Sequence, residues 1–165
     1  MDFEIDVSGE DIWNHDYTIV IAEKSNTYFI RGFKFTKELI QILRTRHGEG
    51  QYRYSMSKQD KSLFRVRTYC IVVYYLFKKL KLERGTEINL HICRDFQGHE
   101  RDITSNLKPL IEKLGLKINK PIYQQLPKGS IADKYAYLLR NDTKNQFKNY
   151  FNISLEEIEE FLKKK

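Results

Sequence analysis

Three aspartates stand where the pattern of apolar residues predicts that a strand ends or a helix begins. Asp6 lies near the end of a strand in which apolar and acidic residues alternate, and Asp95 follows the apolar strand 88–93. Asp133 falls in the first turn of a helix that opens after a Pro-Lys-Gly turn. Carboxylates that converge repel each other, so a cluster of them makes physical sense mainly around a divalent cation. The three residues therefore predict a site for Mg²⁺ or Mn²⁺, which prefer hard oxygen ligands.

The chemistry of such a site would be phosphodiester hydrolysis. Two cations roughly 3.5–4 Å apart can activate a water molecule and stabilise the leaving oxygen of a phosphodiester. Each aspartate also has a simpler structural interpretation. Asp6 and Asp95 precede glycine-containing turns, and Asp133 forms a capping box with Ser130. Only their joint placement in the order of elements favours the catalytic interpretation.

Strands dominate the first part of the chain and helices follow. A helix is expected at 36–46, and a long, nearly all-apolar helix at 57–81. The tight connection Ser25-Asn26 suggests that the strands form an antiparallel meander. Alternation and β-branched residues predict three strands, at 3–7, 17–23 and 28–35.

The second half of the chain alternates strands and helices. One strand is expected at 88–93 and another within 118–126. The helix between them is expected to begin near Thr104 or Ser105, because Pro109 is tolerated only in a first turn. Two later helices are expected to be capped by serines, Ser130 and Ser154.

This order predicts an α/β fold with a five-stranded mixed sheet, an antiparallel meander plus parallel strands, and helices on both faces. The later strands are joined through helices, so right-handed crossovers make them parallel. If the first and fourth strands are neighbours, strand parity lets Asp6 and Asp95 reach one side of the sheet. Small Ala132 and Ala136 let the later helix approach closely enough to add Asp133.

The net charge indicates a phosphate-rich partner. The sequence has 29 Lys and Arg residues against 22 Asp and Glu, a formal charge of +7, which favours nucleic acid over simple solubility as its explanation. Trp13 either stacks on a base or covers the core, and the core is the preferred interpretation. Several basic residues are either solvated helix ends or phosphate-binding groups that read no sequence: Lys58, Lys61, Arg65, Arg67, Arg94, Lys128 and Lys134.

Composition argues against several other classes of protein. A hydrophobic share of 41% and an aromatic share of 13% predict a packed core rather than disorder. No apolar run reaches the roughly 18 residues that a membrane span needs, and the acidic start lacks the features of a secretion signal, so a soluble cytoplasmic protein is expected. Cys70 and Cys93 sit in apolar runs and no CxxC or HExxH pattern occurs, which argues against a disulfide framework or a zinc site.

The order of elements and the placement of the acids resemble the RNase H-like superfamily over residues 1 to about 142. Residues 3–9 and 131–137 are similar to those of uncharacterised RNase H-like proteins that open with Asp-x-Ser-Gly. Residues 92–96, followed by Glu100, are similar to a strand end of Argonaute Piwi domains. This resemblance implies an RNase H-like domain at 1–142 and a helical extension at 143–165 packed on it.

The resemblance also implies a metal-dependent nuclease that acts on DNA or RNA. Asp6, Asp95 and Asp133 would be the catalytic residues and the ligands of Mg²⁺ or Mn²⁺. The long helix lacks the mid-helix glutamate of that superfamily, so Glu100 or Asp60 would have to serve as a further ligand. The alternative is a non-catalytic RNase H-like module that binds nucleic acid, or a subunit of a larger complex.

Overall fold

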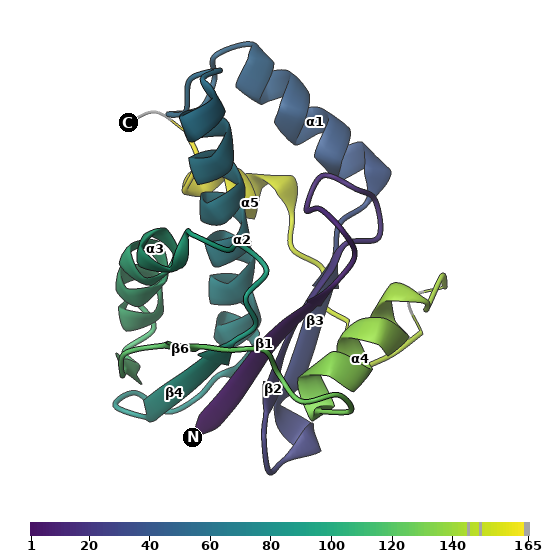
Figure 1. Cartoon of the computed structure of the whole chain (residues 1–165), viewed down its shortest axis with the longest axis vertical. Helices are drawn as coiled ribbons and strands as arrows, with labels where there is room; N and C mark the ends of the chain where they lie inside the picture. Colours follow the sequence, from purple (N-terminus) through teal and green to yellow (C-terminus); the bar gives the residue numbers. More distant parts are fainter. Residues whose placement is uncertain (145, 149, 164–165) are drawn as a thin grey trace.

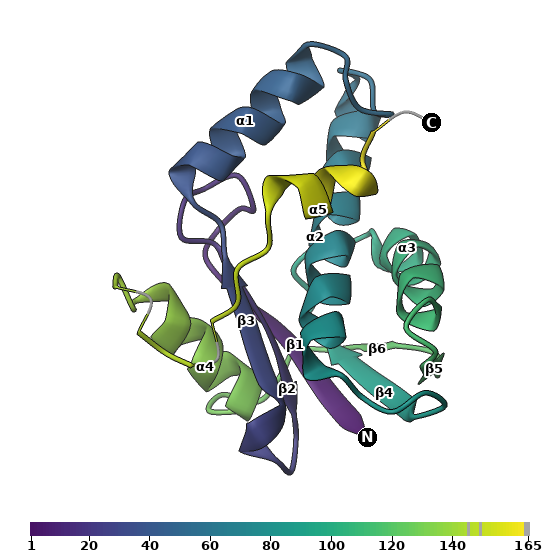
Figure 2. The ribbon, with the colours of Figure 1, turned by 180° about the vertical axis from the view of Figure 1, so that it is seen from behind.

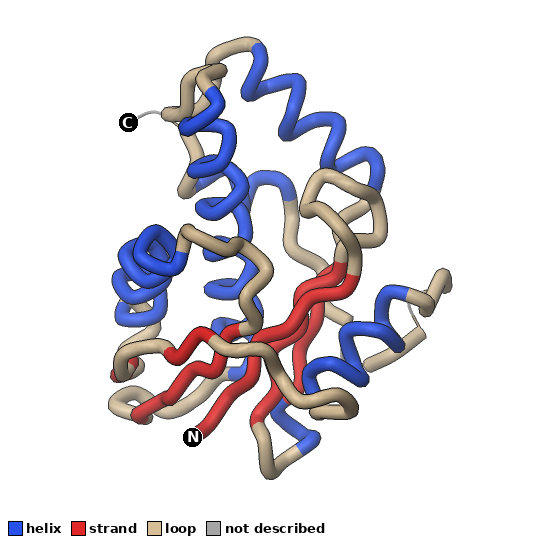
Figure 3. Tube along the Cα trace, in the orientation of Figure 1, coloured by secondary structure: helices blue, strands red, loops and turns tan. Residues whose placement is uncertain are grey.

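A mixed sheet lies at the centre of the computed structural model, which describes residues 1–144, 146–148 and 150–163 (Figures 1 and 3). Three strands form an antiparallel meander: β1 (Asp2–Ser8), β2 (Thr18–Glu23) and β3 (Ile30–Lys34). β4 is parallel to β1, and the two shortest strands are parallel to β4: β4 (Glu87–Ile92), β5 (Lys117–Ile118) and β6 (Ile122–Tyr123). The strand order is β3-β2-β1-β4-β5, with β6 also paired to β4.

The predicted α/β class is confirmed, with an antiparallel meander on one side of the sheet and parallel strands on the other. β1 lies between β2 and β4, so the first and fourth strands are neighbours, as the placement of the aspartates requires. The strand expected within 118–126 is instead two short strands. Pro121 lies between them and has no backbone N–H to donate to a ladder.

Helices cover both faces of the sheet (Figures 1 and 2). α2 (Lys58–Leu80) and α3 (Glu100–Glu112) pack on one face, and α4 (Ile131–Arg140) packs on the other, against β1, β2 and β3. The α2 face holds the larger hydrophobic cluster. The α4-side cluster is small and consists of Val20, Ala22, Ile30, Leu126, Ala132, Ala136 and Leu139.

The long helix α2 is apolar nearly all round because other elements surround it. The Ser57 side chain caps its first turn by accepting a hydrogen bond from the Asp60 backbone N–H. The helix ends at Lys81, which adopts the left-handed conformation with φ 53°. Between these ends α2 contacts the sheet, α3 and α5 (Leu155–Glu160), so most of its side chains are buried. A helix that is hydrophobic on all sides is typical of such a position.

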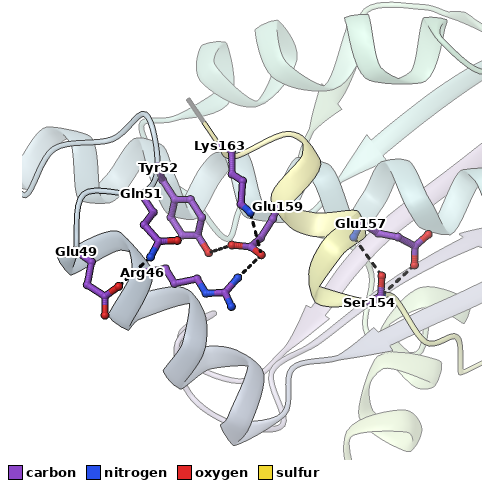
Figure 4. A network of polar contacts seen from close by, with 8 residues as sticks. All are labelled: Arg46, Glu49, Gln51, Tyr52, Ser154, Glu157, Glu159 and Lys163. Atoms are coloured by element: carbon purple, nitrogen blue, oxygen red, sulfur yellow. Dashed lines mark hydrogen bonds and ion pairs between the residues drawn. The ribbon is translucent and has the colours of Figure 1, made fainter. Parts of the chain in front are cut away.

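α1 (Lys37–Gly48) lies beyond the end of the sheet, and α5 crosses α2 (Figure 2). α5 begins with a capping box formed by Ser154 and Glu157 (Figure 4). The predicted extension 143–165 packs on the core through Ile153, Ile158 and Leu162. Its residues 145, 149, 164 and 165 lie outside the described residues.

Two predicted boundaries are wrong. α3 begins at Glu100 and holds Pro109 in its interior, although an interior proline costs about 3 kcal/mol. The helix still forms because it buries an apolar stripe, Ile103, Leu107, Leu110 and Ile111. The strand expected from residue 28 begins at Ile30, because Asn26 caps a short 3₁₀ turn, Thr27–Phe29, through the Tyr28 backbone N–H.

None of the described helices combines the length and the apolar composition that a membrane crossing requires.

Candidate carboxylate site at the ends of β1 and β4

Asp6 is a nearly buried carboxylate on the α4 face of β1. It pairs in register with Val20, a member of the α4-side cluster, and only 6% of the residue is exposed. Its Oδ1 accepts a hydrogen bond from the Val7 backbone N–H at 2.8 Å. Among the described residues, no lysine, arginine or histidine forms an ion pair with it. Because buried charges are normally paired or bound to a metal, this carboxylate requires an explanation.

Burial and neighbouring carboxylates change the pKa of Asp6. Burial is the largest cause that raises the pKa of its carboxyl, and the charges of Asp133 and Asp95 raise it further. Hydrogen bonds from the Val7 backbone and the Cys93 thiol act in the opposite direction. The structure therefore brings the three predicted aspartates into one electrostatic neighbourhood. The topology explains this, since β1 and β4 are parallel neighbours and α4 packs beside β1.

Asp95 lies just past the end of β4 and is held in place by Tyr17. The Cys93 N–H donates to the Ile5 carbonyl oxygen at 3.0 Å, which extends the ladder, and the Asp95 N–H then donates to the Cys93 carbonyl oxygen at 2.8 Å. The buried Tyr17 hydroxyl donates a hydrogen bond to Asp95 Oδ2. Burial of the carboxyl raises the pKa of Asp95, the Tyr17 bond lowers it, and the charge of Asp11 raises it.

Small residues let α4 carry Asp133 to the sheet. Ala132 and Ala136 are fully buried between α4 and the strands. A Cβ atom on Gly32 of β3 would stand only 2.3 Å from Leu139 Cδ1. The close approach that the alanines predict is therefore present, and a glycine on the sheet contributes to it.

Asp133 also has the capping role that the sequence allowed. Its backbone N–H donates to Ser130 Oγ at 3.2 Å, and its Oδ2 accepts a hydrogen bond from the Gly129 N–H at 3.2 Å. The residue is exposed, unlike Asp6. Asp133 therefore stabilises the start of α4, as the capping interpretation predicts, and its charge also acts on Asp6. Its role as a metal ligand stays a prediction.

The donor chemistry of the three aspartates fits Mg²⁺ or Mn²⁺, which take hard carboxylate oxygens. In the described part of the chain, no group of three or more His, Cys, Asp or Glu residues is arranged to hold a metal ion. Tyr17 engages one oxygen of Asp95, and the turn before α4 engages one oxygen of Asp133. Asp6, which has no cationic partner among the described residues, is the side chain that fits a cation best.

Neither residue proposed as a further ligand lies with these three. Glu100 begins α3 and lines a separate cavity of about 660 Å³ with Tyr123. Asp60 belongs to the start of α2, where its Oδ2 accepts a hydrogen bond from the Ser55 N–H at 2.7 Å. The charges of Asp95 and Asp133 thus act on Asp6, whereas Glu100 and Asp60 belong to other parts of the fold.

Sequence reasoning missed Asp11 and Cys93. Cys93 has the same strand parity as Asp95, and the pairing of β1 with β4 brings its thiol to Asp6. Asp11 lies in the loop between β1 and β2, and its Oδ2 is 3.5 Å from Arg65 Nη1 of α2. No local pattern predicts where that loop lies. Arg65 also shows that α2 extends a cation, and not a carboxylate, toward this loop.

The predicted phosphate-binding residues divide into three groups. Lys58, Lys61 and Arg65 line a cavity of about 550 Å³. Lys128 and Lys134 are exposed beside the start of α4. Arg67 and Arg94 form the third group and are held by other protein groups. Arg67 Nη1 donates a hydrogen bond to Asn106 Oδ1 at 2.9 Å, and Arg94 Nε donates to the Tyr123 carbonyl oxygen at 3.2 Å.

Comparisons of the chain with protein-family models, with curated proteins and with solved structures gave no match.

Proposed function

We propose that this protein is a metal-dependent nuclease that hydrolyses phosphodiester bonds at the edge of the sheet where β1 and β4 end. The observation that carries the proposal is Asp6. It is 6% exposed, it has no cationic partner among the described residues, and two further carboxylates act on it. A structural carboxylate in such a place would normally be paired, whereas a ligand of a divalent cation would not.

Each aspartate has a distinct part in this proposal. Asp6 would be the central ligand of Mg²⁺ or Mn²⁺, with Asp95 and Asp133 contributing further oxygens. Such a cation, when bound, lowers the pKa of a water molecule and offsets the charge that develops on the phosphate. Tyr17 is a positioning residue, because its buried hydroxyl holds Asp95 Oδ2. Burial and the charge of Asp95 raise the pKa of Tyr17, so its hydroxyl remains protonated and able to donate.

Exposed lysines at the starts of α4 and α2 would attract the substrate to the protein. Lys128 and Lys134 are exposed on either side of the turn that opens α4, and Lys58 and Lys61 are exposed at the start of α2. With a formal net charge of +7, such side chains attract a phosphate backbone over a range that salt shortens. They would hold the strand, while the carboxylates would carry out the chemistry.

A second function is a nucleic-acid-binding module without catalysis. Two observations favour it. The described residues hold no preformed group of three metal ligands, and α2 directs Arg65 rather than a carboxylate toward the loop after β1. Such a module would use the same basic residues and would bind nucleic acid equally well with or without a divalent cation.

Cleavage assays with a matched pair of variants test the proposal. Labelled single strands, duplexes, RNA–DNA hybrids and branched substrates would be incubated with Mg²⁺, with Mn²⁺ and with a chelator. We expect cation-dependent cleavage that falls at least about 100-fold in Asp6→Asn, as loss of a principal catalytic group does. The control is Glu112→Gln, which removes the same charge from an exposed position at the end of α3 and should cleave like the wild type.

A direct cation-binding measurement separates the two functions. Mn²⁺ binding would be followed by paramagnetic resonance on the wild type and on Asp6→Asn. Binding by the wild type alone, together with cleavage, supports the nuclease. Nucleic-acid binding without Mn²⁺ binding and without cleavage would contradict the nuclease and leave the binding module.

A further inference from the structure

We propose that a single strand of nucleic acid lies in a groove between α1, the first half of α2 and the loop after β1, with one base stacked on Trp13. This inference rests on the proposed function, because it names the substrate class of the same site. We call this surface the Trp13 groove. Its lining includes Trp13, Lys37, Arg44, Lys58, Lys61 and Arg65.

The Trp13 groove consists of two adjoining cavities. One measures about 550 Å³ and the other about 520 Å³, and both are lined by Trp13 and Arg44. Each is of the size that receives a small ligand or one nucleotide. Figure 1 shows the loop after β1 lying beneath α1, which is how these segments come to face each other.

The charge of the groove is of one sign. Its lysines and arginines come from α1 and α2, and no carboxylate of the described residues lines either cavity. Arg65 lies 3.5 Å from Asp11, which lines neither cavity, and the other lysines and arginines of the groove form no ion pair among the described residues. Such a row of cations attracts a phosphate backbone and holds it without reading its sequence.

Trp13 is built as a rigid platform with a free surface. Its ring packs on Phe64 of α2 with the centroids 5.0 Å apart, and Phe64 in turn contacts the rings of Tyr52 and Tyr54. Trp13 nevertheless lines both cavities and is only partly buried. Trp13 therefore covers the core with one side of its ring, as predicted, while another part of the ring faces the cavities. Met56, which is 54% exposed, adds apolar surface at the rim of the larger cavity.

This combination favours a single strand over a duplex. A partly exposed indole beside a basic groove is typical of proteins that bind single strands, because an unpaired base can leave its neighbours and stack on the ring. The bases of a duplex are already stacked, so a duplex would contact only the cations. The aromatic surface of the groove therefore provides a contact that only a single strand can use.

The Trp13 groove adjoins Asp11 in the loop after β1. Arg65 lines the larger cavity, and its Nη1 lies 3.5 Å from Asp11 Oδ2. The charge of Asp11 in turn acts on Asp95. A strand lying along the Trp13 groove would thus contact Lys58 and Lys61 and pass beside the loop after β1.

The fluorescence of Trp13 is a direct test, since the sequence contains a single tryptophan. Oligothymidylate and oligouridylate of about twelve nucleotides, and a duplex of similar length, would be titrated into the wild type and into Asp6→Asn with a chelator present. Anisotropy of the labelled nucleic acid reports binding, and tryptophan emission reports stacking. We expect quenching by the single strands, little quenching by the duplex, and the same result in Asp6→Asn.

Variants supply the second measurement. Trp13→Ala should weaken single-strand binding about 10-fold or more while changing duplex binding little. Trp13→Phe, which keeps a ring against Phe64, provides a folded comparison if the alanine variant is unstable, and should bind single strands with intermediate affinity. Lys61→Gln should weaken binding of both forms and reduce the salt slope by about one. The control is Tyr28→Ala, an aromatic residue that is 71% exposed outside the groove.

Several outcomes would overturn the inference. These are binding that leaves Trp13 emission unchanged, equal affinity for single strands and duplex in both the wild type and Trp13→Ala, or no binding to any nucleic acid. Failure of the nuclease has a different result, namely single-strand binding with quenching but no cation-dependent cleavage. The experiment therefore distinguishes an error in the substrate class from an error in the proposed chemistry.

Discussion

Glu159 of α5 is expected to stabilise the position of α1, which forms one side of the Trp13 groove. The residue is 4% exposed, and its carboxylate accepts a hydrogen bond from the buried Tyr52 hydroxyl at 2.9 Å (Figure 4). It also pairs with Arg46 in the last turn of α1, and Lys163 Nζ lies 3.8 Å from it. One side chain thus joins α5 to α1 and to the segment that leads from α1 to α2.

The size of the effect follows from burial. Glu159→Ala leaves the Tyr52 hydroxyl without its acceptor, and a hydrogen bond to a charged group contributes about 1.5–3 kcal/mol. The ion pair adds little to this, because the Arg46 side chain is 35% exposed and solvent screens it. We therefore expect a loss of about 2–3 kcal/mol, and a smaller loss of about 1 kcal/mol for Glu159→Gln, which keeps a neutral acceptor.

Urea unfolding followed by circular dichroism measures these differences. For a domain of this size, the expected loss in Glu159→Ala corresponds to a melting temperature about 4–12 °C lower. The double variant Glu159→Ala with Tyr52→Phe should lose less than the sum of the single variants, because no hydroxyl is then left unpaired. The control is Glu156→Ala, which removes an exposed carboxylate from the first turn of the same helix.

A change of less than about 0.5 kcal/mol in Glu159→Ala, the size typical of a surface substitution, would show that the bond from Tyr52 to Glu159 does not stabilise the fold. Equal losses in the alanine and glutamine variants would show the same, since the hydrogen-bond acceptor would then contribute nothing.

Three further predictions concern the carboxylate site and α4. Burial raises the pKa of Asp6 above its ordinary value of 3.8. At a pH just above 3.8 the native state therefore binds more protons than the unfolded state, so the stability of the wild type falls as the pH rises through this range. Asp6→Asn should therefore be the more stable protein at neutral pH in chelator, with the difference shrinking toward low pH in urea unfolding; an opposite trend would contradict this. Gly32→Ala, whose Cβ would stand 2.3 Å from Leu139 Cδ1, should lower the free energy of unfolding by about 1–3 kcal/mol, with partial recovery when Leu139→Ala is added. Burial and the charge of Asp6 raise the pKa of the Cys93 thiol to about 12, so Asp6→Asn should speed the alkylation of Cys93, measured by mass spectrometry. Buried Cys70 should stay unmodified, and an unchanged rate at Cys93 would contradict the contact between Asp6 and Cys93.

Local rules explain the parts of the fold that could be predicted. The alternation of residues 3–7 predicts β1, and a serine three residues before an acid predicts the starts of α2, α4 and α5. The small side chains of Ala132 and Ala136 predict the close approach of α4. Each of these features depends on residues within one or two turns of each other, so the sequence displays them directly.

The features of the fold and of the site that could not be predicted depend on contacts between distant segments. Tyr17 and Asp95 are far apart in the chain, and only the path of the loop from β1 to β2 brings them together. The same loop decides that Asp11 faces Arg65. The start of α3 could not be predicted either, because the burial of its apolar stripe outweighs the local cost of Pro109.

The small apolar cluster between α4 and the sheet has a consequence for how readily the carboxylates come together. Few apolar side chains hold α4, and glycine and alanines form much of that contact. Segments held by few apolar contacts detach from a folded protein more often than its core does, so we expect amide protons of α4 to exchange faster than those of α2. Each detachment would carry Asp133 away from Asp6. Cation affinity would then scale with the fraction of time α4 is docked, and the cation would in turn slow the undocking of the helix.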